Sequence, residues 1–375
     1  MLMVLAGLIR SCSPQVEERL MQQTPSNPIC STLVPDENLE AAWEWARSTA
    51  PRTTGMIIYQ NGVLCLERYE LANACPGGLL AFLCRFGPIR WLLLDVLGGS
   101  VYGGSPTRTF SLFSMTKSLA GIAAVLLEEQ GVISLDATVA TYIPEWLNAD
   151  NRKSSITVRE LLSLSSGIDA TSRRARDITL ADGLNAPLLD GETRFDYGAE
   201  PFTVFSQVIK AATGGQDAQA FLDEHLFTPL GISVSMARTN DDVNIPVLST
   251  AGMAPLQDLA TLGLELLAAV NGNGQVLQEQ AIASLTTPGV NPSYGLTFWL
   301  NAEGVDLDGS SLQPPFSQCG NTAAFYMIGG GGQILTVVPD HAFVMVKSAI
   351  LGVSTQQQRQ GMWDALFRDL QCQCD

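Results

Sequence analysis

The pattern of apolar and polar positions predicts strands toward both ends of the chain and helices between them. Residues 53–59 and 63–69 are strand-like runs on either side of Asn61-Gly62, a dipeptide typical of a two-residue hairpin turn. Between about residues 114 and 285 the patterns are mainly helical, separated by Gly, Pro and Asp turns. Further on we expect strands at 294–300, 333–338 and 342–347, and a closing helix at 355–370.

One of the predicted helices differs from an amphipathic surface helix. The run at 118–127 is apolar nearly all round, which predicts a helix buried in the core. Ser114 and Lys117 lie at its start, three residues apart, so their side chains share one helical face. The partial positive charge of a helix N-terminus also surrounds Ser114.

This pair carries the most informative chemistry in the sequence. The chain has four lysines among 21 basic residues, and only Lys117 has a serine three positions before it. A lysine amine can accept a proton, whereas an arginine cannot, so a neutral lysine beside a hydroxyl can activate a serine without histidine. A lone S-x-x-K match is a weak signal, because many such matches are ordinary helix surface.

The neighbouring sequence strengthens the S-x-x-K assignment, because it resembles a known family. Residues 129–136 (EQGVISLD), 142–146 (YIPEW) and 156–168 (ITVRELLSLSSGI) resemble the serine β-lactamase-related family. This family comprises penicillin-binding proteins, class C β-lactamases, family VIII esterases and 6-aminohexanoate-dimer hydrolases, and the last two are closest in motif form. The resemblance extends from about Tyr59 to about Lys347.

The resemblance implies the fold and its layout. The expected class is α/β (α+β), an antiparallel sheet flanked by helices with an inserted all-helical region, as in β-lactamases and transpeptidases. Residues 1–37 would be an N-terminal export signal and linker, and 38–375 a single catalytic domain. Within it, the sheet parts would lie at about 50–113 and 290–375 and the helical part at about 125–285, with the active site in the cleft between them.

A tyrosine stands where the family carries its Y-x-N motif. Tyr197 follows Ser114 by 83 residues, in the segment RFDYGA. The resemblance implies that Tyr197 passes protons between the serine, the lysine and the leaving group, helped by nearby positive charge that eases loss of its own proton. The alternative is a packed aromatic side chain before a turn. Ala199 replaces the usual Asn or Ser of a substrate-binding position, and its methyl group cannot hydrogen-bond a substrate amide.

A glycine run near the C-terminus resembles the third family motif. Phosphate-binding loops lead into a helix, whereas residues 329–332 lead into a predicted strand. This glycine run, followed by Gln333, resembles the GxGGQ sequence that some family members carry in place of the K-T-G motif. It implies an oxyanion hole made by the backbone N–H groups of Ser114 and Gly330, with Gly329 and Gly331 beside the substrate. Turn glycines are the simpler alternative. Met327 replaces the Lys or His that helps to hold a β-lactam carboxylate.

Composition excludes several other functions. A net charge of −16 argues against a nucleic acid partner, because a phosphate backbone would be repelled. No stretch of eighteen apolar residues predicts a membrane-spanning helix. The only histidines are His225 and His341 and there is no G-x-S-x-G motif, which argues against a Ser-His-Asp hydrolase. No H-E-x-x-H or paired C-x-x-C predicts a metal site, and no cofactor is implied.

Cysteines and the N-terminus bear on localisation. Eight cysteines favour disulfides in an oxidising compartment, whereas Cys65, inside a strand pattern, fits a buried thiol equally well. The apolar start followed by Cys12 resembles a clipped lipoprotein signal, although a basic region is missing and Arg10 does not fit a lipobox. We expect an exported protein, periplasmic or lipid-anchored through Cys12, with the cytoplasm as the alternative.

Residues 75–97 form an apolar segment broken by Gly87-Pro88, so neither half can span a bilayer. Arg85, Arg90 and Trp91 suit peripheral membrane contact, or a flap over an acyl pocket that favours apolar acyl groups. A helical hairpin packed on the protein's own core is the alternative.

Together these features predict a serine hydrolase that forms an acyl-enzyme on a small ester or amide. In this interpretation Ser114 attacks, Lys117 takes its proton and Tyr197 relays the proton to the leaving group. A β-lactamase or D-alanyl-D-alanine carboxypeptidase is the alternative enzyme, and a non-catalytic scaffold of the same fold is the alternative from another class. The oligomeric state is not indicated.

Overall fold

The computed structural model describes residues 34–49, 53–69, 106–147, 151–170, 178–190, 194–314, 323–349 and 355–367. The expectations for Cys12 and for residues 75–97 lie outside these ranges.

A six-stranded antiparallel sheet forms the centre of the fold, with strand order β2-β1-β11-β10-β9-β6. The hairpin predicted at Asn61-Gly62 is confirmed, and both turn residues have positive φ, +49° and +73°, as its geometry requires. β1 pairs with β11, so strands nearly 300 residues apart in the sequence meet in the middle of the sheet. The strands are β1 (Thr53–Gln60), β2 (Val63–Tyr69), β6 (Trp299–Leu300), β9 (Phe325–Gly329), β10 (Gln333–Val338) and β11 (Phe343–Ala349).

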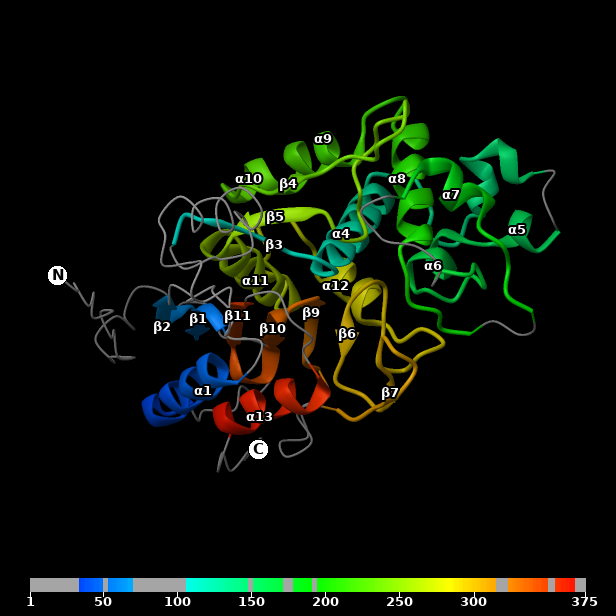
Figure 1. Ribbon diagram of the computed structural model, residues 1–375. Coiled ribbons are helices and arrows are strands. Elements are labelled where there is room, and N and C mark those ends of the chain that lie inside the picture. Colours follow the sequence, from blue (N-terminus) through cyan, green and yellow to red (C-terminus); the bar gives the residue numbers. More distant parts are fainter. Residues whose placement is uncertain are drawn as a thin grey trace, which may run out of the picture.

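Helices cover both faces of this sheet (Figure 1). α1 (Asp36–Ser48) and α13 (Gln356–Leu366) pack together on one face, and α11 (Leu256–Val270) lies on the other against β10 and β11. α4 (Met115–Glu129) contacts β9 and α12 (Glu279–Thr286) on that same side. Because both faces are covered, every residue of β10 and β11 is buried. The antiparallel sheet and its helical layers confirm the expected fold class.

The predicted buried helix is α4, and thirteen of its fifteen residues are buried. The described part of the chain between 130 and 231 consists mainly of short helices, and those between residues 151 and 212 lie toward one end of the molecule in Figure 1. These are α5 (Asn151–Ser155), α6 (Val158–Leu162), α7 (Leu180–Asn185), α8 (Glu200–Ala212), α9 (Ala218–Leu222) and α10 (Thr228–Leu230), with the short helical turns η3 (Val139–Thr141), η4 (Pro144–Trp146) and η5 (Asp223–Phe227).

The expectation of an all-helical insertion is wrong in one respect. β4 (Ser235–Met236) and β5 (Gly252–Pro255) lie within it and form a small sheet with β3 (Thr109–Ser111). Gly252 explains this pairing, because a Cβ atom there would lie 2.8 Å from the Thr116 hydroxyl. Its backbone instead accepts from the N–H of Leu112 at 2.8 Å and donates to Thr116 Oγ1 at 3.0 Å. The small sheet therefore fixes the chain that leads into α4.

The strand expected at 294–300 is also shorter than predicted. Only Trp299–Leu300 pair with β9, because Thr297 adopts a positive φ of +71° and Leu296 donates to the carbonyl of Leu285 instead of a strand. The remaining short elements are β7 (Gly304–Val305), β8 (Ser311–Leu312) and the turn η7 (Pro339–His341).

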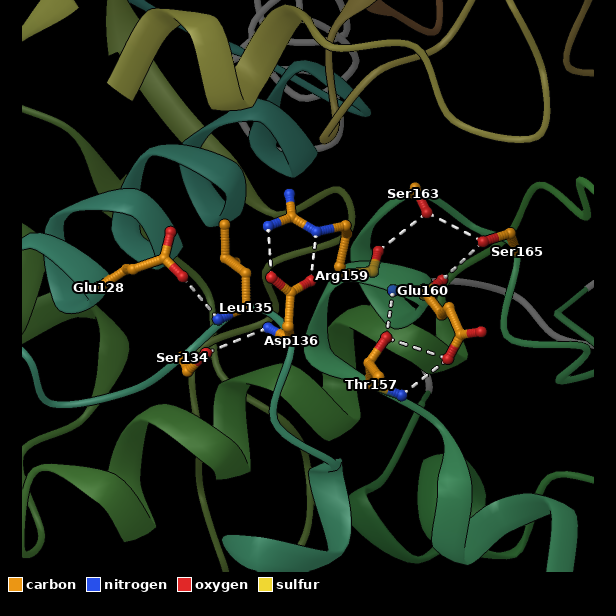
Figure 2. Close-up of polar contacts among 9 residues, drawn as sticks. All are labelled: Glu128, Ser134, Leu135, Asp136, Thr157, Arg159, Glu160, Ser163 and Ser165. Atoms are coloured by element: carbon orange, nitrogen blue, oxygen red, sulfur yellow. Dashed lines mark hydrogen bonds and ion pairs between the residues drawn. The ribbon is translucent and has the colours of Figure 1, made fainter. Parts of the chain in front are cut away.

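Figure 2 shows the polar contacts made by the segments that resemble the family in sequence. Arg159 forms two hydrogen bonds with the Asp136 carboxylate, at 2.7 and 3.2 Å. Glu128, at the end of α4, accepts from the N–H of Leu135 at 2.8 Å. Thr157 and Glu160 form a capping box at the start of α6. The spacing of these residues in the sequence thus reflects one network that ties α4 to α6.

Cys65 lies in β2, is 3% exposed and takes part in a disulfide bond. The disulfide interpretation is therefore correct for this cysteine, and the buried-thiol alternative is wrong for it. Among the described helices, none is both long enough and apolar enough to cross a membrane.

Candidate active site

Ser114 and Lys117 meet at the N-terminus of α4. Ser114 immediately precedes the first residue of the helix, and the Lys117 amine donates a hydrogen bond to Ser114 Oγ at 3.1 Å. The same amine donates to the carbonyl of Ser249 at 2.9 Å, and only 2% of Lys117 is exposed. Phe113, just before the serine, has a φ of +47°, a left-handed conformation that is costly for a side chain of its size. The backbone is therefore held under strain at the residue that aims Ser114.

Burial changes the protonation of Lys117. Loss of solvent lowers the pKa of its amine to about 7, against a weaker opposing effect from the charge of Glu200, which raises it. About half of the molecules therefore carry a neutral amine near pH 7, whereas an ordinary lysine would be almost fully protonated. A neutral amine next to a serine hydroxyl can accept its proton.

Tyr197 lies beside both residues. Lys117 Nζ is 4.8 Å from the centre of the Tyr197 ring, and the tyrosine hydroxyl hydrogen-bonds Ser114. Burial raises the pKa of Tyr197 to about 12, and the hydrogen bond with Ser114 only partly offsets this. The expectation that nearby positive charge eases loss of the phenolic proton is therefore wrong. At neutral pH Tyr197 is a phenol that can donate a proton.

Packed aromatic rings hold Tyr197 in place. Its ring centre lies 5.9 Å from Trp299, 6.2 Å from Phe195 and 6.3 Å from Tyr294. Trp299 and Tyr294 are themselves buried, at 2% and 1% exposure. The packed-aromatic interpretation is thus correct for the ring of Tyr197, and the hydroxyl on the same ring hydrogen-bonds Ser114.

The glycine run lies next to the backbone of the serine. A Cβ atom at Gly329 would lie 2.2 Å from the carbonyl oxygen of Leu112, so the end of β9 approaches this chain as only glycine allows. Gly330 is exposed and faces Phe113, which a Cβ atom would meet at 3.6 Å. Gly331 and Gly332 have φ values of +82° and +90°, so these two are turn glycines.

The two N–H groups expected to form an oxyanion hole are Ser114 and Gly330. At the start of α4, the N–H groups of Met115 and Thr116 already donate to the carbonyls of Leu112 and Phe113. Among backbone bonds outside helices and strands in the described residues, neither Ser114 nor Gly330 is a donor. Within the described residues, neither N–H group is thus bonded to a backbone carbonyl.

Two positions that depart from the family motifs are buried. Ala199 is 4% exposed and packs with Ile178 and Val247 in a small apolar cluster, before the first turn of α8. Met327 is fully buried within β9. Neither side chain presents a polar group near Ser114.

Sequence reasoning missed two groups around Lys117. The Ser249 carbonyl is a backbone group and leaves no signature in a sequence. Glu200, at the first position of α8, is 1% exposed and acts on Lys117 through its charge. An acidic residue three positions after Tyr197 and directly before a proline was the available signal.

Both histidines pack against phenylalanine rings. His225 packs against Phe221 at 4.5 Å between ring centres, and His341 is buried beside Phe367 at 5.8 Å. In the described part of the chain, no group of three or more His, Cys, Asp or Glu side chains could hold a metal ion.

Comparison with known proteins places the chain in a family. A sequence profile of the family described as Beta-lactamase matches residues 98–368. The "Putative penicillin-binding protein PbpX" of Bacillus subtilis strain 168 is 24% identical over 245 residues, 58% of this chain and 61% of PbpX. The matched segment thus spans less than two thirds of that relative's own length.

Solved structures agree on the fold. A "family VIII carboxylesterase" is 18% identical with a TM-score of 0.63, covering 91% of this chain and 98% of its own. A "Putative 6-aminohexanoate-dimer hydrolase from Bacillus anthracis" is 17% identical with a TM-score of 0.60, covering 90% and 88%. The fold and the profile together define a β-lactamase/transpeptidase-like protein. The chain belongs to the beta-lactamase family, as its sequence motifs predicted.

Proposed function

We propose that this protein is a serine hydrolase that cleaves a small ester or amide through an acyl-enzyme. The single observation that carries the proposal is the fully buried Lys117 amine, 3.1 Å from Ser114 Oγ, with its pKa lowered to about 7. This is the arrangement that turns a serine into a nucleophile at neutral pH.

In the proposed first step, Ser114 Oγ forms a bond to the substrate carbonyl carbon and its proton passes to Lys117 Nζ. The carbonyl becomes an oxyanion, for which the N–H groups of Ser114 and Gly330 serve as donors. As the tetrahedral intermediate collapses, the bond to the leaving group breaks and the leaving atom takes a proton from Tyr197. Lys117 then restores the proton to Tyr197.

Deacylation reverses these roles. Water attacks the acyl carbon, its proton passes through Tyr197 to Lys117, and the bond from the carbon to Ser114 Oγ breaks. The serine oxygen takes this proton back from Lys117, and the acid is released. The high pKa of Tyr197, about 12, fits a group that relays a proton without remaining ionised.

Two buried apolar residues bear on the substrate class. Met327 stands in place of a basic residue that would hold a carboxylate, and Ala199 in place of a residue that would hydrogen-bond an amide. Both replacements favour an ester or simple amide over a β-lactam as substrate. Two proteins of similar fold are named for such activities, one as a carboxylesterase and the other as a 6-aminohexanoate-dimer hydrolase. We expect nitrocefin to be hydrolysed far more slowly than the best ester, and comparable rates would contradict this assignment.

The central experiment replaces Ser114 by alanine. The wild-type protein should react with a fluorophosphonate probe and hydrolyse short-chain p-nitrophenyl esters, and Ser114→Ala should lose both activities by a factor of about 10³ or more. Ser118→Ala is a matched control, because Ser118 is on the same helix but donates to the Thr297 carbonyl instead. Near-full esterase activity in Ser114→Ala would refute the proposal, and an unlabelled, inactive wild type would favour the scaffold alternative.

We further propose that the protein is exported. The disulfide at Cys65 supports this, because disulfides persist in oxidising compartments. Fractionation of the native host with thiol alkylation before lysis tests it, and a reduced, cytoplasmic Cys65 would contradict it.

A further inference from the structure

Glu200 is a carboxylate sealed inside the protein next to the candidate site. It is 1% exposed, at the first position of α8, three residues after Tyr197. One of its oxygens accepts from the N–H of Ala199 at 3.2 Å, so the side chain turns back toward the start of the helix. A buried carboxylate is costly unless an opposite charge or several hydrogen bonds stabilise it.

The buried amine of Lys117 is held against the same stretch of chain. Its Nζ lies 4.8 Å from the ring centre of Tyr197 and 5.3 Å from that of Phe202. Glu200 lies between these two residues in sequence. Residues 197–202, which lead into the first turn of α8, therefore bring both rings and one carboxylate to the surroundings of Lys117. The two charged side chains share an interior from which water is excluded.

Other titratable groups near Lys117 do not take this role. The charge of Glu200 is the one that raises the pKa of Lys117. The elements packed most closely against α4 are α8, α9, α12 and β9. Besides Lys117 and Glu200, the titratable residues on α4 and on these four elements are Glu128, Glu129, Lys210, Glu279 and Tyr326. Arg194, Asp196 and Tyr197 lie in the chain before α8, Asp217 lies directly before α9, and Tyr294 lies between α12 and β6.

We propose that Glu200 is a positioning residue whose carboxylate is the counter-charge of Lys117 and sets how strongly its amine takes a proton. The inference rests on the function proposed above. When Ser114 attacks, Lys117 becomes an ammonium ion in a dry interior. Burial alone would make it a poor proton acceptor, and a nearby carboxylate stabilises the protonated form. Glu200 thus offsets the burial that makes the amine neutral in the first place.

A direct test measures the protonation of Lys117 by NMR. With four lysines in the chain, lysine labelled with ¹³C at Cε gives few signals, and Lys117→Arg assigns the one of interest. We expect Lys117 to titrate near pH 7 in the wild type. In Glu200→Gln, which can still accept from Ala199, it should titrate about one pH unit lower or more.

Two controls separate charge from structure. Lys347 is an internal reference, because its low pKa arises from burial and Arg359 and should not change. Glu265→Gln removes another buried carboxylate, one that accepts from the N–H groups of residues 275–277, and should leave Lys117 unchanged. If Glu200→Gln does not fold, Glu200→Asp gives a graded test, since its shorter side chain should lower the pKa of Lys117 by less.

A rate measurement links the titration to catalysis. For ester hydrolysis, the ratio of kcat/KM at about pH 6 to that at about pH 8 should rise about fivefold in Glu200→Gln, because more of the amine is neutral at the lower pH. This ratio is insensitive to a general loss of activity. A folded Glu200→Gln in which Lys117 titrates at the wild-type pH overturns the inference. A lowered Lys117 pKa in a protein that hydrolyses neither an ester nor an amide leaves the inference standing and refutes the proposed function.

Discussion

Lys347 offers a sharp test of how this protein tolerates a buried amine outside the candidate site. It lies in β11 and is 6% exposed, and within the described residues its amine makes no hydrogen bond or ion pair. It shares a sheet face with Phe343, which packs on Phe367 just after α13. Burial first, and the charge of Arg359 second, lower the pKa of Lys347 to about 7.

The stability effect follows from linkage. In the unfolded chain Lys347 has its ordinary pKa of 10.5, so below that pH the unfolded state binds a proton that the folded state refuses until about pH 7. The folded state therefore loses stability as the pH falls from about 10.5 to about 7, and the penalty is constant below. At 1.36 kcal/mol for each pH unit, the full penalty is about 5 kcal/mol, an order-of-magnitude figure.

Replacing Lys347 by methionine should remove this penalty, since methionine is unbranched and adapts to irregular apolar space. The assay is urea unfolding of the wild type and Lys347→Met at several values between about pH 6 and about pH 10. We expect the variant to be more stable by several kcal/mol at about pH 7, with the difference shrinking as the pH approaches about 10. Lys210→Met, at a partly exposed lysine, is the control and should change little.

A stability difference that is independent of pH would refute the reasoning, because it would mean that Lys347 is protonated in the folded state. A less stable variant would refute it as well, by showing that the amine has a favourable partner. The contribution of Lys117, which titrates in the same range, cancels in the comparison.

Three further predictions concern the candidate site. Lys117→Arg should lower kcat/KM for esters by a factor of about 10³. In the wild type, kcat/KM should fall tenfold per pH unit below about pH 7, because the acid limb of the pH profile reports the pKa of Lys117. An acid limb near pH 5 would contradict this. Tyr197→Phe should lose activity clearly but less than Ser114→Ala, whereas unchanged rates would remove Tyr197 from the proton relay. Gly329→Ala should abolish labelling by the fluorophosphonate probe, since its Cβ would lie 2.2 Å from the Leu112 carbonyl oxygen. Gly330→Ala keeps its backbone N–H and has room for a Cβ, so its labelling should persist, and equal effects of the two variants would contradict the placement of β9.

Much of the fold was predictable because it depends on local signals. The Asn61-Gly62 hairpin and the strand β10 lie where turn chemistry and apolar runs placed them. The short strands β4 and β5 were not predictable, because two to four residues carry no period and pair only where Gly252 fits against Thr116. The strand expected from residue 294 failed for a similar reason, since the positive φ of Thr297 depends on its neighbours in space.

The sequence by itself determined the family, the buried helix and the pairing of Ser114 with Lys117, because a spacing of three residues on a helix fixes that contact locally. Only the tertiary structure decided the protonation of the site. Whether Lys117 is neutral depends on how completely α4 is buried and on the carboxylate of Glu200, which lies 83 residues further along the chain, on α8. The same burial raises the pKa of Tyr197, against the sequence-based expectation. Charge, solvent exclusion and distance are properties of packing, and no local pattern encodes them.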